Sequence, residues 1–309
     1  MKIGMHTGQQ DCPFDDLRRV WRLADENGFA WVSVWDHFYE APYLGGGSPV
    51  YETVSTMAAL ASMTKNVRVG CLVYSAGYRP PALMAKVATT LDHISNGRVT
   101  LGMGAGWHAA EYEAFGYEFP GPKIRLDMLE ESVQIIKSML TTESTTFDGA
   151  HFRVTDAQCN PKPVQENLPV WIGGQGEKRT LRLAARYADG WNAAYISAEA
   201  FKHKNEVLDS WCDVEKRDPA KIERSINVNF VMGADDVAAR RNRENFEQQW
   251  GARAQSLVPG ALLGRSAQVI EQIGHFRDLG TENLNIALRP PFDWEAIQAF
   301  IEEVMPKFR

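Results

Sequence analysis

An acid and an imidazole stand side by side in the segment Trp35-Asp36-His37-Phe38. A histidine titrates near neutral pH, and a neighbouring carboxylate can fix its tautomer or raise its pKa, which suits proton transfer. Asp36 could instead cap the following turn while His37 packs in the loop. His6 could also join the pair as metal ligands, but no convincing further ligand accompanies them. We therefore predict that His37 and Asp36 are the catalytic acid/base pair.

A first glycine-rich segment reads Gly102-Met103-Gly104-Ala105-Gly106-Trp107. Small residues there let the backbone approach a flat ligand closely, while Trp107 could wall the pocket. A GxGxG run also occurs where a chain simply leaves a strand. Its position after an apolar run favours a ligand site, and we predict that Ala105, Gly106 and Trp107 contact a cofactor.

A second glycine-rich segment follows another apolar run and opens a helical pattern. Free amides and the positive end of a helix dipole make such a turn an anion site, and two basic residues add charge. The segment matches neither a Walker loop nor a dinucleotide fingerprint, and it could be a purely structural turn. We predict that it binds a cofactor phosphate through Gly173, Gly174, Gln175, Gly176, Glu177, Lys178 and Arg179.

Short apolar runs alternate with helix-period segments along the whole chain, which is the pattern of repeated βα units and a parallel sheet. The eight units of this 309-residue chain predict a single α/β domain over residues 1–309, a (β/α)8 TIM barrel with insertions. A doubly wound sheet is the competing topology. In a barrel, catalytic groups lie just after the strand ends at the C-terminal face, where all the candidates above fall. The strands are expected at 2–5, 30–35, 67–73, 98–103, 169–172, 190–194, 226–232 and 284–288.

The helices of these units follow from apolar stripes at helical spacing. Two segments interrupt the alternation. An Asp-Gly pair within 146–154 predicts a hairpin outside the barrel, and 235–263 is expected to be an extra helical insertion. The helices are expected at about 13–28, 52–63, 80–96, from 125 onward, 198–216, 266–279 and 293–305.

Composition narrows the function further. The formal net charge of -6 argues against nucleic acid as a partner, because binding phosphate backbones requires a basic surface. The four cysteines form no CxxC pair, so we read them as reduced thiols of a cytoplasmic protein. No export signal and no run of about 20 apolar residues is visible, so we expect no membrane association.

Several further segments add to the motifs above: Tyr78-Arg79-Pro80-Pro81-Ala82 with Lys86 and Ala88-Thr89-Thr90-Leu91-Asp92, Ser95-Asn96-Gly97-Arg98, Asn160-Pro161-Lys162-Pro163, and Trp171 to Arg179 with Arg186-Tyr187-Ala188-Asp189-Gly190-Trp191-Asn192. Together they make the chain resemble the luciferase-like monooxygenase superfamily over nearly its full length. Within that superfamily it is most similar to the deazaflavin-dependent oxidoreductases, which use coenzyme F420. The resemblance implies a barrel with a cofactor across its C-terminal mouth, a small-molecule substrate and a homodimer.

The resemblance also assigns roles. In the deazaflavin sugar-phosphate dehydrogenases of this superfamily an Asp-His pair binds and protonates at the ring, and Asp36 and His37 match that pair. Those enzymes carry a glutamate as proton acceptor after the fourth strand, where this chain has Trp107. The difference argues against sugar-phosphate oxidation and favours a reductase acting on an unsaturated or imine-like substrate, which the sequence does not identify.

A further implied feature lies at the end of the third strand. Members of the superfamily often hold a non-prolyl cis peptide there, which presses on the central ring of the cofactor. Aligned here it falls at Leu72-Val73, with Val73-Tyr74 one step away as the alternative and an all-trans strand end as the other possibility. Leu72, Val73 and Tyr74 are therefore expected to contact the cofactor.

Two other functions stay open at this stage. Flavin-dependent relatives share the fold and similar turns, so an FMN-dependent monooxygenase using reduced flavin and dioxygen is the alternative. A flavin-binding barrel without turnover is the third possibility, because a fold alone does not establish chemistry.

Overall fold

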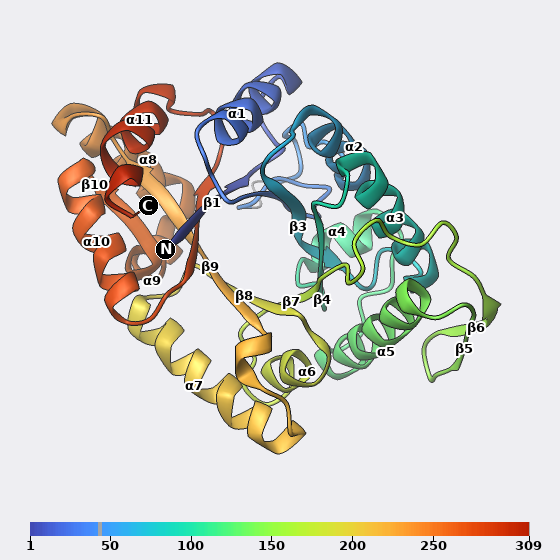
Figure 1. The fold of residues 1–309 in the computed structure, drawn as a ribbon. Helices are drawn as coiled ribbons and strands as arrows, with labels where there is room; N and C mark the ends of the chain where they lie inside the picture. Colours follow the sequence, from blue (N-terminus) through green and yellow to red (C-terminus); the bar gives the residue numbers. More distant parts are fainter. Residues whose placement is uncertain (43–44, 309) are drawn as a thin grey trace.

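The computed structural model describes residues 1–42 and 45–308, in which eight parallel strands close into a barrel surrounded by helices (Figure 1). Each strand pairs with the next, and β8 pairs with β9 to complete the ring. The predicted TIM barrel is confirmed. Its strands are β1 (Lys2–Thr7), β2 (Trp31–Val34), β3 (Arg68–Ser75), β4 (Val99–Gly104), β7 (Val170–Gly173), β8 (Gly190–Ala194), β9 (Glu223–Met232) and β11 (Asn283–Leu288).

Seven of the outer helices lie where the apolar stripes predicted them, and the eighth is the one that the second glycine-rich segment was expected to open. In the first, Leu17, Val20, Trp21 and Ala24 are buried against the barrel, and two acids in the first turn favour the helix dipole. The remaining helices of the ring pack in the same way. The ring consists of α1 (Phe14–Glu26), α2 (Thr53–Met63), α3 (Pro81–Ser95), α5 (Pro122–Thr141), α6 (Thr180–Tyr187), α7 (Ala198–Glu215), α10 (Ser266–Asp278) and α11 (Trp294–Ala299).

The expected hairpin is present as β5 (Thr145–Asp148) and β6 (Arg153–Ala157), which pair antiparallel at the periphery beside α5 (Figure 1). The insertion contains α8 (Asp236–Trp250) and α9 (Ala254–Leu257) as expected. It is not helical throughout, however, because β10 (Ala261–Gly264) pairs parallel with β9. The pairing of β9 with β8 ends at Asn227, so the last residues of β9 leave an open edge, which β10 covers. A short helix that was not expected, α4 (Ala109–Ala114), follows β4.

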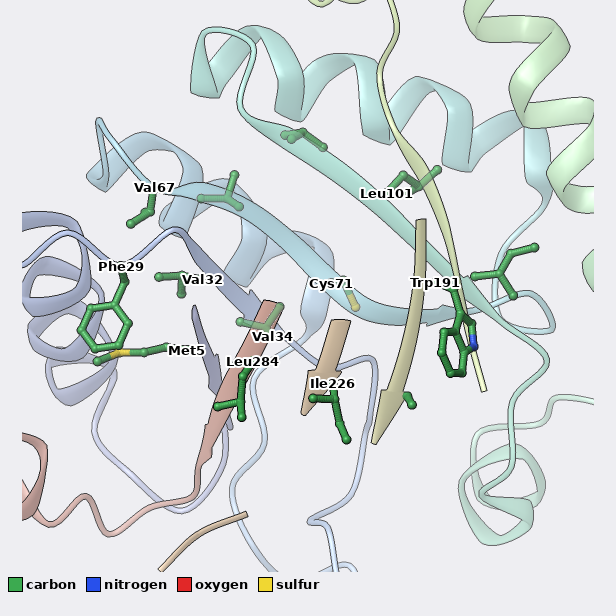
Figure 2. Packing of buried hydrophobic residues seen from close by; sticks show 14 of the residues in the cluster. Met5, Phe29, Val32, Val34, Val67, Cys71, Leu101, Trp191, Ile226 and Leu284 are labelled. Atoms are coloured by element: carbon green, nitrogen blue, oxygen red, sulfur yellow. The ribbon is translucent and has the colours of Figure 1, made fainter. Parts of the chain in front are cut away.

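The main hydrophobic core fills the space between barrel and helices. Figure 2 shows outward-facing residues of several strands packed together, among them Val32, Val34, Leu101 and Ile226, which are all at most 1% exposed. Burying each such side chain contributes about 1.5–3 kcal/mol relative to leaving it exposed. This core fixes the strand ends that carry the site.

Inside the barrel, two tryptophans fill the end at which the strands begin. Trp31 and Trp171 stack with their ring centroids 5.1 Å apart and their planes 23° from parallel. The space they need comes from glycines, since a Cβ atom at Gly70 would lie 3.1 Å from the Trp31 ring, and Gly190 abuts the Trp171 ring. Leu72 packs against this pair of tryptophans.

Across residues 1–42 and 45–308, no helix combines the length and apolar character that a membrane crossing requires.

Candidate active site

A cavity of about 450 Å³ opens at the C-terminal end of the barrel. Most of the predicted site residues meet in its wall: Asp36, His37, Leu72, Val73, Ala105, Gly106, Trp107, Gly173, Gly174 and Gln175. The structure adds residues that we did not predict as ligand contacts, among them Ser75, Asn192, Tyr195, Trp250 and Arg289. Tyr74, Gly176, Glu177, Lys178 and Arg179 are absent from this wall.

The floor of the cavity is formed by Leu72 and Val73, whose peptide bond is cis, as predicted. The glycines around it make room for the Val73 side chain. A Cβ atom at Gly173 would lie 2.7 Å from Cγ1 of Val73, and one at Gly104 would lie still closer to Cγ2. The glycines that end β4 and β7 therefore make room for the floor itself, as well as for the approach of a ligand.

Tyr74, the next residue, does not face the cavity. Its ring is 1% exposed, in the core, and the guanidinium of Arg79 lies 5.7 Å from the ring centroid. Burial raises the pKa of its hydroxyl well above the ordinary value. The expected contact between this side chain and a cofactor is therefore not supported, because alternate residues of a strand face opposite sides of the sheet.

His37 is held by a buried carboxylate. Its Nδ1 atom lies 2.9 Å from Oε2 and 3.0 Å from Oε1 of Glu111, a residue of α4 with no exposed surface. This contact leaves Nε2 as the nitrogen available to the cavity. On the same side, the His37 and Trp107 rings approach edge to face with their centroids 5.3 Å apart, and Trp107 is 58% exposed.

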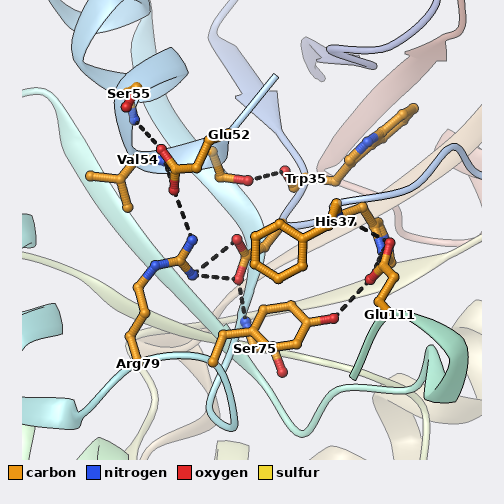
Figure 3. A network of polar contacts seen from close by, with 12 residues as sticks. Trp35, His37, Glu52, Val54, Ser55, Ser75, Arg79 and Glu111 are labelled. Carbon is orange, nitrogen blue, oxygen red and sulfur yellow. Dashed lines mark hydrogen bonds and ion pairs between the residues drawn. The ribbon is translucent and has the colours of Figure 1, made fainter. Parts of the chain in front are cut away.

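Glu111 collects four donors in all. Besides the contact with His37 (Figure 3), it accepts hydrogen bonds from the backbone N–H groups of Phe38 and Tyr39 at 3.1 and 2.9 Å and from the hydroxyl of Tyr78 at 2.7 Å. Burial by itself would raise the pKa of Glu111, but the hydrogen bond and charge of His37 and the other donors outweigh it, so the pKa lies below its usual value. Glu111 is therefore an anion that orients His37.

Asp36 has different partners. Its carboxylate accepts two hydrogen bonds from Nη1 of Arg79, at 2.8 and 3.0 Å, and one from the Ser75 amide at 2.9 Å. Arg79 also reaches Glu52 at 2.9 Å (Figure 3). The orienting role expected of Asp36 thus falls to Glu111 in this structure. Through these hydrogen bonds Asp36 links the loop after β2 to the end of β3. Asp36 also lines the cavity.

His6 lies deeper in the same cavity. It is 3% exposed, and its Nδ1 atom lies 2.8 Å from the Ser33 hydroxyl. Burial, with the charges of Arg289 and His37, lowers its pKa from 6.5 to about 3. His6 is therefore a neutral imidazole at physiological pH. Among the described residues, no group of three or more His, Cys, Asp or Glu is arranged to hold a metal ion.

The predicted anion-binding turn joins β7 to α6. The five consecutive backbone amides of Gln175 to Arg179 donate to no group among residues 1–42 and 45–308, whereas the Gly174 amide is bonded to the Asn192 carbonyl at 3.1 Å. Free amides at a helix start are the usual elements of a phosphate site. Gly174 has a φ of +127°, a conformation that favours glycine.

The side chains of this turn divide into two groups. Gln175 reaches into the cavity wall and donates to the Ala194 carbonyl at 2.6 Å. Glu177 is bound by Lys204 at 2.5 Å, and Arg179 pairs with Asp127 at 2.7 Å, so both point to neighbouring helices. Lys178 is exposed. Glu177 and Arg179 can therefore serve an anion through their backbone amides, with Lys178 as the available cation.

Glu111, Trp250 and Arg289 are the functional candidates that the sequence did not reveal. Glu111 is one acid in a six-residue helix, and its role depends on a contact with a residue 74 positions away. Arg289 directly follows a predicted strand, so its position could have identified it as a site residue. Trp250 belongs to the insertion, for which no motif was available.

Comparisons with known proteins agree with this arrangement. Residues 1–283 match the family model for luciferase-like monooxygenases. The chain is 32% identical to the F420-dependent glucose-6-phosphate dehydrogenase of Amycolatopsis mediterranei (strain U-32), over 100% of this chain and 99% of that protein. It is 26% identical to the 5,10-methylenetetrahydromethanopterin reductase of Archaeoglobus fulgidus, over 100% of both.

A solved structure has the same fold. An F420-dependent secondary alcohol dehydrogenase, in complex with an F420-acetone adduct, superimposes with a TM-score of 0.87 over 100% of this chain and 99% of that one, at 21% identity. The family model covers most of the chain, and the relative at 32% identity extends over all of it. By fold, site and sequence, the chain belongs to the luciferase-like monooxygenase family.

Proposed function

We propose that the protein is an oxidoreductase that transfers a hydride between coenzyme F420, a deazaflavin, and a small organic substrate, acting as a reductase. One observation carries the proposal: a turn with five backbone amides that bond to no described residue, and a histidine backed by a buried carboxylate, flank the same cavity. Relatives that match the full chain and are named F420-dependent support the choice of this cofactor over FMN.

The residues present fit such a cofactor. The amides of Gln175 to Arg179 and the ammonium of Lys178 are donors for a phosphate. The small residues Ala105 and Gly106, with Val73 below, leave space for a flat ring over the floor. When bound, the deazaflavin carries the hydride. The protein's own contribution is to hold the ring, exclude water and supply a proton.

His37 donates the proton in this proposal. Reducing a polarised double bond requires a hydride at one atom and a proton at the other. His37 lines the cavity with Nδ1 engaged by Glu111, which leaves Nε2 to donate the proton. Glu111 lies behind the imidazole and is absent from the cavity wall, so it acts through His37. The Glu111 carboxylate holds the imidazole in place, and Trp107 stands where the sugar-phosphate dehydrogenases of the superfamily carry a proton-accepting glutamate, which favours the reductive direction.

The test is a titration of the purified protein with F420 and, separately, with FMN, followed by an anaerobic screen of enone and imine acceptors with reduced F420. We expect tighter binding of F420 and acceptor-dependent reoxidation, seen as the return of deazaflavin absorbance. Tighter binding of FMN together with oxygen consumption would establish the monooxygenase instead. F420 binding with every acceptor inert and no reverse reaction would establish a barrel without turnover.

We further propose that the enzyme is a homodimer of the cytoplasm. The dimer rests on the family resemblance, and sedimentation velocity tests it. The compartment is supported by the four cysteines, Cys12, Cys71, Cys159 and Cys212, which are all free thiols.

A further inference from the structure

A second cavity, of about 550 Å³, lies beside the first. It is enclosed by α8 of the insertion and by the C-terminal ends of β9 and β11. Trp250 and Arg289 line both cavities, so the two spaces meet at these side chains. A ligand larger than the first cavity could therefore extend into the second.

Arg289 is a cation without an ionic partner in the part of the chain that the structure describes. Its Nη1 donates to Oδ1 of Asn229 at 2.8 Å and its Nε to the Ala41 carbonyl at 3.3 Å, while Nη2 makes no hydrogen bond to these residues. The guanidinium lies 5.0 to 5.6 Å from the ring centroids of Tyr195, Trp250 and Trp35. A half-buried guanidinium in such a setting favours an anionic partner.

Two further donors of this second cavity are unused. Asn229 is 1% exposed, and since its Oδ1 accepts from Arg289, its Nδ2 is the free end, with no partner among residues 1–42 and 45–308. Nε1 of Trp250 is likewise buried without a partner among those residues. Buried polar groups are nearly always hydrogen-bonded, so orphan donors on a cavity wall mark the place of an acceptor.

The acid of this wall does not compete for these donors. Asp293 accepts from Arg241 at 3.0 Å and from Asn242 at 2.8 Å, and its other oxygen caps α11 through the Ala296 amide at 3.0 Å. The unsatisfied groups are thus one cation and two neutral N–H donors. A planar oxyanion that accepts several hydrogen bonds fits this set, and guanidinium and carboxylate pair well.

We propose that the second cavity binds a carboxylate of the substrate through Arg289, Asn229 and Trp250, with the reducible double bond in the first cavity beside His37. The substrate class is then an unsaturated organic acid. This inference deepens the proposed reductase function and rests on it for the position of the double bond. The carboxylate site itself can be tested without turnover.

The experiment compares cinnamate with cinnamamide, two probes of the same shape that differ in charge, by isothermal titration calorimetry on the full-length protein. We expect cinnamate to bind about tenfold more tightly, the usual scale for a hydrogen bond to a charged group. Asn229→Asp replaces the orphan donor by an anion that pairs with Arg289, and should abolish the preference. Trp250→Phe removes the indole N–H but keeps a ring, and should reduce it. Gln158→Glu, an exposed position absent from both cavity walls, adds the same charge elsewhere as the control.

Equal affinity of the wild type for both probes would overturn the proposal. So would a preference for cinnamate that persists in both Asn229→Asp and Trp250→Phe, with circular dichroism showing that the variants are folded. The carboxylate that binds at this site could belong to the substrate or to the cofactor, and repeating the titration with saturating F420 distinguishes the two. Displacement of cinnamate by F420 would assign the site to the cofactor and overturn a substrate role. Binding is measured apart from turnover. Failure of the reductase assay would therefore not change the binding result, and failure of the binding experiment would not change the result of the reductase assay.

Discussion

Nδ1 of His37 lies 2.9 Å from the carboxylate of Glu111, which has no exposed surface and lies on the side of the imidazole away from the cavity. The pair joins the loop after β2 to α4, a helix that the sequence did not predict. An imidazole held in this way keeps its proton on Nδ1, because the carboxylate accepts only from an N–H group.

His37→Ala should lower turnover by about 10²-fold while leaving F420 affinity nearly unchanged, the usual scale for the loss of a general acid. The measurement is steady-state kinetics beside a cofactor titration. His37→Gln keeps a polar side chain at the same place and controls for the loss of packing against Trp107. Turnover that survives both changes would mean that water or another residue supplies the proton.

Glu111→Gln should lower stability at neutral pH by about 1–3 kcal/mol, because it leaves buried donors with a poorer acceptor. The pKa of Glu111 lies below its usual value of 4.5 in the folded protein, so its anion stabilises the fold fully above that value, and the stabilisation is lost as the pH falls through the folded pKa. Urea unfolding of both proteins across this range should show their difference shrinking toward acid. A difference independent of pH would contradict an ionised Glu111.

Asp36→Ala should destabilise the protein by about 3 kcal/mol, since it leaves Arg79, whose side chain is 12% exposed, without its main partner. The buried carboxylate is already occupied by Arg79 and the Ser75 amide, so we expect F420 affinity to change less than stability does. Chemical denaturation and cofactor titration measure the two effects. A large loss of affinity at unchanged stability would return Asp36 to the role of a direct cofactor contact.

Gly174→Leu should weaken F420 binding by about tenfold or more, by pushing a side chain into the turn with the free amides. Its positive φ adds about 1–3 kcal/mol of backbone strain. Gly280→Leu is the matched control, because Gly280 has a φ of +90° and open space around it, outside both cavities. Fluorescence titration should show the affinity loss only for Gly174→Leu, and equal losses in both variants would assign the effect to strain.

Much of the arrangement could be predicted from local signals. Apolar runs predicted the strands, because buried parallel strands are apolar on both faces. Since the segments that follow the strands of a (β/α)8 barrel lie at one end of it, the sequence also placed His37 and the turn at Gly173 at the same end. The short strand β10 was missed because a run of four small and apolar residues is equally compatible with a helix. Its conformation is decided by the free edge of β9, a feature of the assembled sheet.

The hydrogen-bond partners of the site residues could not be predicted from sequence patterns. Asp36 and His37 are adjacent in the chain, yet Asp36 bonds Arg79 and His37 bonds Glu111. Successive residues point in different directions, so adjacency in sequence said little about which of them would meet. The Asn229 and Trp250 donors likewise become recognisable as a pair only once the insertion is folded against the barrel.

The stacked indoles of Trp31 and Trp171 determine how molecules can travel through this barrel. Leu72 and Val73 pack against them, and among the described residues the cavity that the two indoles line at the end where the strands begin shares no lining residue with the first cavity. Cofactor and substrate must share the opposite opening for entry and departure. We therefore expect the ligand that lies against the floor to bind first and to leave last, an order that product-inhibition patterns would show.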